Sequence, residues 1–367
     1  MQINFLSQIK SHLRISLPAH WYRATLTPLT ALLIPLSFLF GVIATGRRFL
    51  YQSGLLRSHS FAAPVIVVGN ITVGGTGKTP FVIWLVQFLK AQGLKPGIVS
   101  RGVGGEYHAQ PYRVTSDSSV DSVGDEAMLL FKRVNCPIVI SKDRVKAVRS
   151  LLKSSDCNIV ISDDGLQHYR MSRALEIVIV DHARQFGNQH LLPAGPLRES
   201  LTRLKKVDFV VENGDNTPYS MLLEGNRLFS VKHSNQTVML SELKNMRVHA
   251  VAGIGNPDRF FQVLKSAGLK VSEHPFPDHY HYRARDLDFH DALPILMTEK
   301  DAVKCAAFAN GQYWYLPVTA KPNMEFQKKL LSKLSSLGVQ SDEQKNPMPE
   351  SSRSFAIVTE NDSQRGK

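Results

Sequence analysis

The chain contains little cysteine. Only Cys136, Cys157 and Cys305 occur among its 367 residues, and no two of them form a close pair in the sequence. This excludes a disulfide scaffold and a zinc site built from cysteine clusters, and it fits a reducing compartment. Hydrophobic residues nevertheless make up 43% of the chain and charged residues 20%. That is enough apolar material to form a core, so wholesale disorder is also excluded.

Acidic residues are scarce relative to basic ones. There are 31 Asp and Glu against 44 Lys and Arg, which gives a formal net charge of +13. A basic surface favours polyanions, namely nucleic acid, nucleotide phosphates or an anionic membrane face. A soluble protein with a solvated basic surface is the remaining alternative. Nucleic acid is not an expected partner, because the sequence lacks a recognition motif and interleaved aromatic and basic residues.

One long run without charge lies near the N-terminus, at residues 24–46. About 20 apolar residues are enough to span a bilayer. However, Arg23 and Arg47 flank the run on both sides, which the positive-inside rule disfavours, and Pro28 and Pro35 should bend a helix. We expect a helix or kinked pair lying in the cytoplasmic leaflet. A full span and a helix buried against the globular domain are the alternatives.

After residue 60, short apolar runs alternate with helical patterns. Expected strands lie at 64–68, 94–100, 137–141, 158–162, 175–180, 207–211, 227–231, 248–252, 293–297 and 313–318, and expected helices at 80–90, 125–134, 144–154 and 257–267. Apolar strands separated by helices predict an α/β fold with a mostly parallel sheet covered on both faces.

The pattern restarts near Lys205, and its composition changes again after residue 334. We therefore expect a membrane-associating helical segment at 1–58, an α/β core at 59–205 and a smaller α/β domain at 206–334. The polar residues 335–367 are expected to be disordered.

A glycine-rich loop follows the first core strand and reads Thr72-Val73-Gly74-Gly75-Thr76-Gly77-Lys78-Thr79. Strand, glycine-rich turn, Gly-Lys-Thr and helix is the context of a phosphate-binding loop, in which backbone N–H groups and the helix N-terminus hold phosphate oxygens. Lys78 would reach the β- and γ-phosphates of ATP, and Thr79 would offer its hydroxyl to Mg²⁺. Thr72 stands where such loops usually have glycine. The alternative is a glycine-rich turn with an incidental lysine.

Two acidic pairs provide candidates for metal binding and proton transfer. Asp163 and Asp164 end an apolar strand, as a magnesium-binding aspartate of a nucleotide kinase does. Asp125 and Glu126 begin an expected helix, where acids also complement the helix dipole. Asp125 is the candidate base, and Glu126 joins Thr79, Asp163 and Asp164 as a candidate magnesium ligand.

Further candidates are basic. Arg101, Arg144 and Arg198 are candidate phosphate contacts, since guanidinium groups pair with phosphate bidentately, and surface ion pairing is the alternative for each. His274, Asp278, His279 and His281 lie close together in the sequence. A metal site there is disfavoured, since neither cysteine nor helical spacing supports zinc, and structural histidines in a surface loop are the alternative.

The loop and several other blocks together resemble the tetraacyldisaccharide 4′-kinase (lipid A 4′-kinase) family. Thr72 is normal in this family. The resemblance extends from about residue 60 to 305 and includes Ser100-Arg101-Gly102, Gly124-Asp125-Glu126, Ser141-Lys142-Asp143-Arg144, Asp163-Asp164-Gly165-Leu166-Gln167-His168, Pro193-Ala194-Gly195-Pro196-Leu197-Arg198-Glu199, Gly253-Ile254-Gly255-Asn256-Pro257, Phe276-Pro277-Asp278-His279 and Thr298-Glu299-Lys300-Asp301.

The resemblance implies a P-loop kinase core joined by a short two-stranded linker to a smaller α/β domain. It implies transfer of the γ-phosphoryl group of ATP to the 4′-hydroxyl of an acylated glucosamine disaccharide 1-phosphate. It also implies that Asp125 pairs with His279, and that a hydrophobic N-terminal helix meets the inner membrane from the cytoplasmic side. The rival interpretation is a P-loop switch or metallochaperone-type protein that hydrolyses a nucleotide to regulate a partner.

Overall fold

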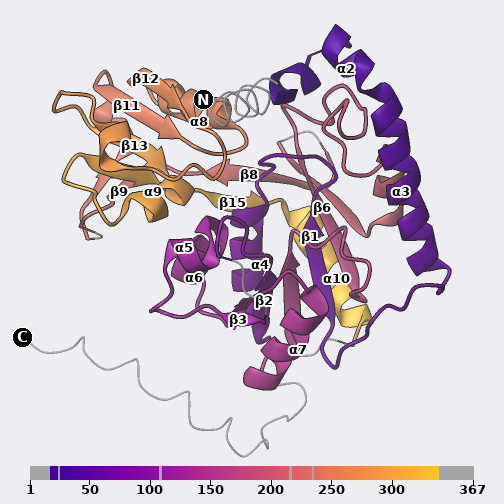
Figure 1. Ribbon diagram of the computed structural model, residues 1–367. Coiled ribbons are helices and arrows are strands. Elements are labelled where there is room, and N and C mark those ends of the chain that lie inside the picture. The colour runs from indigo at the N-terminus through magenta and orange to yellow at the C-terminus, as the bar shows by residue number, and fades with distance from the viewer. Residues whose placement is uncertain (1–16, 24, 107–109, 215–216, 234, 339–367) are drawn as a thin grey trace, which may run out of the picture.

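Two β-sheets organise the chain, and helices pack on both faces of each (Figure 1). The computed structural model describes residues 17–23, 25–106, 110–214, 217–233 and 235–338. The predicted α/β fold with a large, mostly parallel sheet is confirmed.

The larger sheet has nine strands in the order β15-β8-β7-β6-β1-β5-β2-β4-β3. Their bounds are β1 Val65–Gly69, β2 Pro96–Ser100, β3 Tyr112–Arg113, β4 Ile138–Ile140, β5 Ile159–Asp163, β6 Leu175–Asp181, β7 Phe209–Asn213, β8 Ser220–Glu224 and β15 Thr319–Pro322. All neighbours from β4 to β8 are parallel, whereas the two edge strands β3 and β15 are antiparallel. Because helices cover both faces, the central strands β1 and β5 are buried along their whole length rather than at alternate residues.

Helices α4 (Lys78–Ala91), α6 (Asp125–Arg133) and α10 (Met324–Ser336) pack on one face of this sheet, and α7 (Arg144–Ser154) packs on the other. The short α5 (Val120–Val123) precedes α6. Phe81, Leu85 and Leu89 recur at helical spacing along α4 and are completely buried. In a parallel sheet of this kind, ligands usually bind at the edge where the strands' carboxyl ends lie. The phosphate loop lies at that edge, because it connects the end of β1 to the start of α4.

The smaller sheet has the order β10-β9-β14-β13-β11-β12. Its strands are β9 Arg227–Ser230, β10 Thr237–Met239, β11 Arg247–Ala252, β12 Lys270–Pro275, β13 Ile295–Thr298 and β14 Tyr313–Leu316, with helices α8 Pro257–Ser266 and α9 Glu299–Cys305. Phe261 of α8 packs in the core on one face, and Cys305 of α9 packs in the core on the other.

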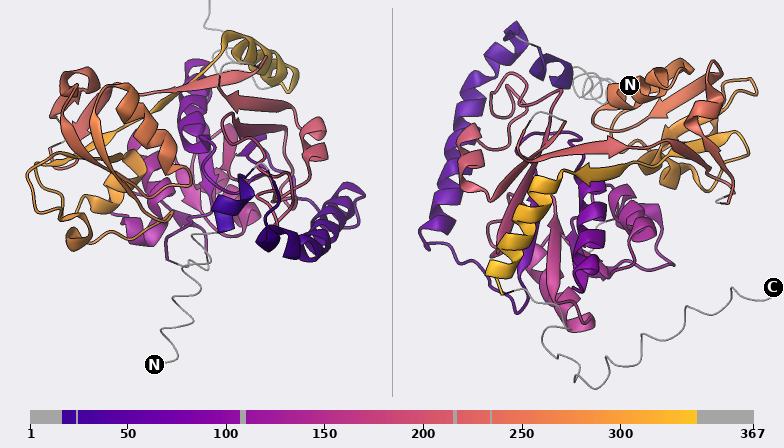
Figure 2. Two further views of the ribbon diagram at one scale, coloured as in Figure 1. Left: turned by 90° about the horizontal axis from the view of Figure 1, so that it is seen from above. Right: turned by 180° about the vertical axis from the view of Figure 1, so that it is seen from behind.

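The larger sheet extends beyond the boundary expected near residue 205. β7 and β8 continue it, and after the smaller sheet the chain returns through β15, antiparallel to β8. α10 then packs on the larger sheet (Figure 2). There the ring of Phe326 contacts the rings of Phe81 and Phe209. The division between the sheets therefore falls between β8 and β9 rather than near 205. The rhythm of strands does not reveal which sheet a strand joins, because that depends on tertiary pairing.

The C-terminal expectation also changes. α10 runs to Ser336, so residues 335 and 336 are helical, and residues 339–367 of the expected tail lie outside the described residues.

In the N-terminal segment, residues 17–21 are helical, and two further helices follow, α2 (Pro28–Leu32) and α3 (Ile34–Gln52), separated at Leu33. Pro28 and Pro35 lie in the first turns of these helices, where the missing N–H is not needed, so they start helices rather than bend one. None of the helices among the described residues combines the length and the hydrophobicity that a membrane span requires.

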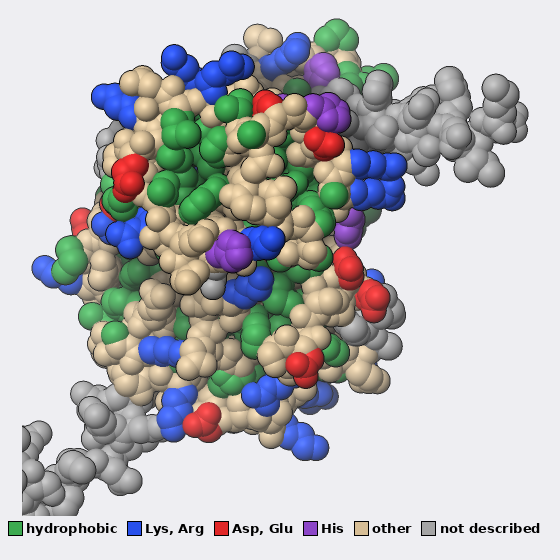
Figure 3. Space-filling view, turned by 90° about the vertical axis from the view of Figure 1, so that its left-hand side faces the viewer, with side chains coloured by type: hydrophobic (Ala, Val, Ile, Leu, Met, Phe, Trp, Pro, Cys, Tyr) green, Lys and Arg blue, Asp and Glu red, His purple; other side chains and the backbone are tan. Residues whose placement is uncertain are grey.

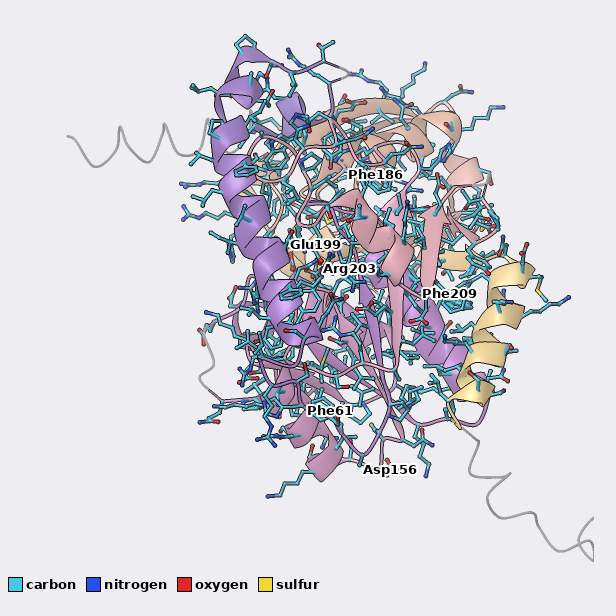
Figure 4. The ribbon with its side chains drawn as sticks, turned by 90° about the vertical axis from the view of Figure 1, so that its right-hand side faces the viewer. Phe61, Asp156, Phe186, Glu199, Arg203 and Phe209 are labelled. Carbon is cyan, nitrogen blue, oxygen red and sulfur yellow. The ribbon has the colours of Figure 1, made fainter. Side chains whose placement is uncertain are left out.

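α3 is attached to the larger sheet's domain through few polar contacts. The hydroxyl of Ser37 donates to the carbonyl of Leu191 at 2.8 Å and accepts from the N–H of Ala194 at 2.9 Å. At the other end of the helix, Arg48 lies 3.9 Å from Glu199, which also pairs with Arg203 at 3.4 Å (Figure 4). One side of α3 is thereby held against the domain while much of its apolar surface stays exposed.

Candidate active site

The phosphate loop lies between β1 and α4, as the sequence predicts. Gly74 and Gly77 have φ values of 109° and 94°, a backbone region that residues with a Cβ rarely adopt. The N–H of Val73 donates to the carbonyl of Pro196 at 2.9 Å, which ties the loop to the neighbouring segment. α4 begins at Lys78, so the N–H groups of its first turn and its partial positive charge face the loop.

Asp163 and Asp164 lie beside this loop because β5 is the direct neighbour of β1, with Val68 opposite Asp163. Asp164 accepts from Arg198 at 3.1 and 3.2 Å, and its Oδ1 lies 3.6 Å from Lys78 Nζ. Burial alone would raise the pKa of Asp164, but Lys78 and Arg198 hold it well below its usual range.

Asp163 has the opposite electrostatic environment. Its side chain is buried, and the hydroxyl of Ser100 donates to it at 3.4 Å. Burial, followed by the negative charges of Glu126 and Asp164, raises the pKa of Asp163 to about 7. The carboxylates of Asp163 and Asp164 are oxygen ligands of the kind that Mg²⁺ prefers, and Mg²⁺ usually binds one or two carboxylates together with substrate phosphates.

The three arginines predicted to contact phosphate are placed differently. Arg198 is partly exposed and holds Asp164, whereas Arg101 is exposed after β2. Arg144 is buried and donates to the backbone carbonyls of Ser141 at 2.7 Å and Asp163 at 3.1 Å. Burial lowers the pKa of Arg144 to about 10. Arg144 therefore supports the backbone that carries Asp163.

Asp125 and His279 come together from different parts of the fold. His279 Nδ1 lies 3.0 Å from both carboxylate oxygens of Asp125, the first residue of α6. This hydrogen bond raises the pKa of His279. Burial opposes ionisation of Asp125, but its bond to His279 and the charges of Lys300 and Lys304 hold its pKa below the usual range. Asp125 is thus an ionised carboxylate in a buried position.

Two lysines of α9 complete this cluster, and no pattern in the sequence assigns a role to either of them. Lys300 Nζ lies 3.0 Å from both Glu126 and Asp278 and 3.9 Å from Asp125. Lys304 Nζ lies 3.8 Å from Asp125 and 2.8 Å from Asp301. The block Thr298-Glu299-Lys300-Asp301 was the available signal, but nothing in one sequence shows that it faces α6.

His274 pairs with another histidine instead of joining this cluster. His274 is hydrogen-bonded to His249 of β11 at 2.9 Å, and both rings stack on Phe289. Among the side chains that the structure describes, no group of three or more His, Cys, Asp or Glu is arranged to hold a metal ion.

The chain matches the family model described as tetraacyldisaccharide-1-P 4′-kinase over residues 29–335. Relatives named tetraacyldisaccharide 4′-kinase include proteins of Nitrosococcus oceani (48% identical, covering 86% of this chain and 93% of the relative), Methylobacillus flagellatus (48%, 88% and 96%) and Coxiella burnetii (46%, 87% and 95%).

A solved structure agrees with this result. The "apo" form of LpxK from Aquifex aeolicus in complex with ATP superposes with a TM-score of 0.69 at 31% identity, covering 83% of this chain and 99% of that chain. The P-loop kinase fold, the sequence relatives and the family match over most of the length agree, and the chain therefore belongs to the tetraacyldisaccharide 4′-kinase family.

Proposed function

We propose that this kinase transfers the γ-phosphoryl group of ATP to the 4′-hydroxyl of a tetraacyldisaccharide 1-phosphate at the edge of the larger sheet, between the phosphate loop and the Asp125–His279 pair. One observation carries the placement: Glu126, next to Asp125, lies near enough to Asp163 beside the loop for its charge to act on that carboxylate, and Asp125 and His279 are paired at 3.0 Å. The product is the bis-phosphorylated lipid A precursor.

The phosphate loop, residues 72–79, binds the phosphates of ATP. Its backbone N–H groups and the N-terminus of α4 favour phosphate oxygens, and Lys78 supplies a full positive charge. Asp164 pairs with both Lys78 and Arg198 and so places two cations beside the loop. Charge on the transferred group is spread over its oxygens in the transition state, so positioned cations contribute mainly to kcat.

We infer that a magnesium ion binds at the same edge together with the ATP phosphates; because these phosphates supply part of its ligands, a preformed group of three acidic ligands is not needed. Thr79, Glu126, Asp163 and Asp164 would hold it: all four offer oxygen donors, and Asp163 is buried near the negative charges of Glu126 and Asp164. When bound, Mg²⁺ supplies charge neutralisation on the β- and γ-phosphates. Asp163 is the better direct ligand, since Asp164 is already paired with Lys78 and Arg198.

Asp125 accepts the proton of the 4′-hydroxyl, and His279 orients the Asp125 carboxylate. The low pKa of Asp125 keeps it unprotonated at neutral pH, and its hydrogen bond to His279 fixes its direction. Lys300 links Glu126 of α6 to Asp278 beside His279, and it therefore holds the two sides of the site together.

The N-terminal helices meet the cytoplasmic face of the inner membrane. Leu32, Phe38 and Ile43 are 78%, 75% and 61% exposed, far more than apolar side chains of a folded core. The basic Arg47 and Arg48 follow on α3, a pattern typical of helices that lie at an anionic lipid surface. The acyl chains of the substrate require the enzyme to work at such a surface.

The nucleotide-hydrolysing switch and a nucleic-acid-binding role are weaker candidates. On the face shown in Figure 3, Lys and Arg side chains are spread apart among uncharged surface rather than gathered into a stripe, which does not match a nucleic-acid track. A nucleotide-hydrolysing switch would also leave the exposed apolar residues of the N-terminal helices without a function.

Incubation of the full chain with ATP, Mg²⁺ and tetraacyldisaccharide 1-phosphate, followed by mass analysis of the lipid, tests the proposal. We expect the lipid to gain one phosphoryl group, with ATP turnover only when the acceptor is present. Nucleotide hydrolysis of equal rate without acceptor would favour the switch instead.

A further inference from the structure

The carboxamide of Asn213 lies against the phosphate loop. Asn213 ends β7, is 3% exposed, and its Nδ2 donates to the carbonyl of Thr76 at 3.2 Å. A Cβ placed on Gly77 would lie 2.7 Å from the same Nδ2, so the amide is packed directly on the start of α4. No motif in the sequence marks this asparagine.

The other end of the same carboxamide is held by the smaller sheet's domain. Arg259 of α8 donates through Nη2 to Asn213 Oδ1 at 2.6 Å. Its Nη1 lies 3.5 Å from the carboxylate of Asp181 at the end of β6, and Asn256 Nδ2 donates to that carboxylate at 3.4 Å. Because only an oxygen can accept from a guanidinium, Arg259 determines which end of the amide faces the loop.

A second contact joins the same two parts of the protein. Gly255, just before α8, packs so closely on the loop that a Cβ there would lie 2.4 Å from the backbone nitrogen of Gly75. Arg184 donates to the carbonyl of Gly255. The segment that carries Arg259 is thereby fixed against the loop from the other side.

Peptide geometry gives the Asn213 contact a consequence. In a planar trans peptide, the carbonyl and the following N–H point in opposite directions. Asn213 holds the carbonyl of Thr76 toward β7, and this aims the N–H of Gly77 away from β7. The direction of N–H groups in such a loop determines whether they converge on phosphate oxygens.

We propose that Asn213 is a positioning residue for the nucleotide, and that Arg259 acts through it. The affinity of the phosphate loop for nucleotide then depends on how the smaller sheet's domain packs against the loop. The proposal rests on the proposed binding of ATP phosphates by this loop. It goes beyond that function because it assigns ATP affinity partly to a residue of α8 that belongs to neither the loop nor the Asp125–His279 pair.

The variants Asn213→Ala, Arg259→Met and the double variant test this in the full chain. Affinity for ADP and for a non-hydrolysable ATP analogue is measured by titration calorimetry without acceptor. We expect Asn213→Ala to weaken nucleotide binding by about tenfold, because a buried carbonyl loses its donor and the loop loses its fixed direction. Arg259→Met should cost several-fold, and Arg259→Lys, which keeps a donor, should recover part of that loss.

The double variant separates positioning from simple charge attraction. If Arg259 acts through Asn213, removing it in the Asn213→Ala background changes nucleotide affinity by less than about twofold. If Arg259 merely attracts phosphate, its loss costs the same in both backgrounds, and the proposal is wrong. Unchanged nucleotide affinity in Asn213→Ala would overturn it directly.

Steady-state kinetics distinguish positioning from damage to the fold. The KM for ATP should rise about tenfold in Asn213→Ala, whereas kcat at saturating ATP and the KM for the lipid acceptor should stay within about threefold. A parallel loss in all three constants would indicate a structural role only. Arg259 is partly exposed, so Arg259→Met keeps the test available if Asn213→Ala does not fold.

Two controls complete the design. Lys265→Gln removes the 2.6 Å pair with Glu273 from the same helix α8 without touching the loop, and it should leave nucleotide affinity unchanged. Lys78→Ala tests the loop itself. If Lys78→Ala also binds nucleotide normally, the assignment of the phosphate loop is wrong. If Asn213→Ala binds nucleotide normally but Lys78→Ala does not, only the proposed role of Asn213 and Arg259 is refuted.

Discussion

His279 Nδ1 is equidistant from the two carboxylate oxygens of Asp125, at 3.0 Å, although 154 positions separate the residues in the sequence. Asp125 begins α6, which packs on the larger sheet. His279 follows β12, which is paired with β11 in the smaller sheet. Any relative movement of the two parts would open this contact. The pair is therefore available for chemistry only when the two parts are closed together.

Kinetics of this pair should be non-additive. We expect Asp125→Asn and His279→Ala each to lower kcat by about 10²-fold or more, the usual scale of general acid–base catalysis, with ATP affinity nearly unchanged. The double variant should lose far less than the product of the two effects, because the residues act as one unit. His290→Ala, at an exposed histidine in the same segment, is the matched control. Multiplicative losses would return His279 to a structural role.

Lys78→Ala should lower kcat by about 10²-fold or more, because its ammonium acts on charge that develops in the transition state. Initial rates with the lipid acceptor at saturating ATP measure this. Lys90→Ala, at the exposed end of the same helix α4, should retain nearly full activity. A correctly folded Lys78→Ala enzyme with normal turnover would refute the role of Lys78.

The Asp125–His279 contact should depend on pH in a defined direction. The folded-state pKa of His279 is raised above its unfolded value, so its stabilising contribution is complete below the unfolded pKa and is lost as pH rises through the folded one. The Tm difference between the wild type and His279→Gln should therefore be larger at about pH 6 than at about pH 9. Asp125, whose pKa is lowered, loses its own contribution only in more acidic solution. An equal Tm difference at both pH values would contradict this account.

Membrane association should depend on the exposed apolar residues of α3. Phe38→Ser and Ile43→Ser should each reduce binding to anionic phospholipid vesicles by about tenfold, because burial of such a side chain contributes roughly 1.5–3 kcal/mol. Co-sedimentation with vesicles provides the measurement. Met324→Ser, at a 64% exposed apolar residue on α10, is the control and should bind as the wild type does. If both α3 variants sediment normally, the anchor lies elsewhere.

Local patterns in the sequence were sufficient for much of the fold. The apolar runs that became β1, β5 and β6 are strands because their residues are β-branched and buried on both sides. The phosphate loop was recognisable because glycines, lysine and the flanking strand and helix are adjacent in the chain. The Asp125–His279 pair was expected only through the family resemblance, not through spacing.

Tertiary structure alone decided the features that join distant segments. β8 and β15 are about 95 residues apart, yet they pair at the edge of the larger sheet, where the chain leaves for the smaller sheet and returns, so the domain division could not be located from strand rhythm. Arg144 looked like a phosphate contact, but its burial turns it toward the carbonyls of Ser141 and Asp163. The sequence by itself determined which elements form and where the phosphate loop lies, because hydrophobic periodicity and backbone preferences are local. Which side chains face Asp125, the phosphate loop and one another depended on packing between elements, since those contacts gain their energy only once the sheets are assembled.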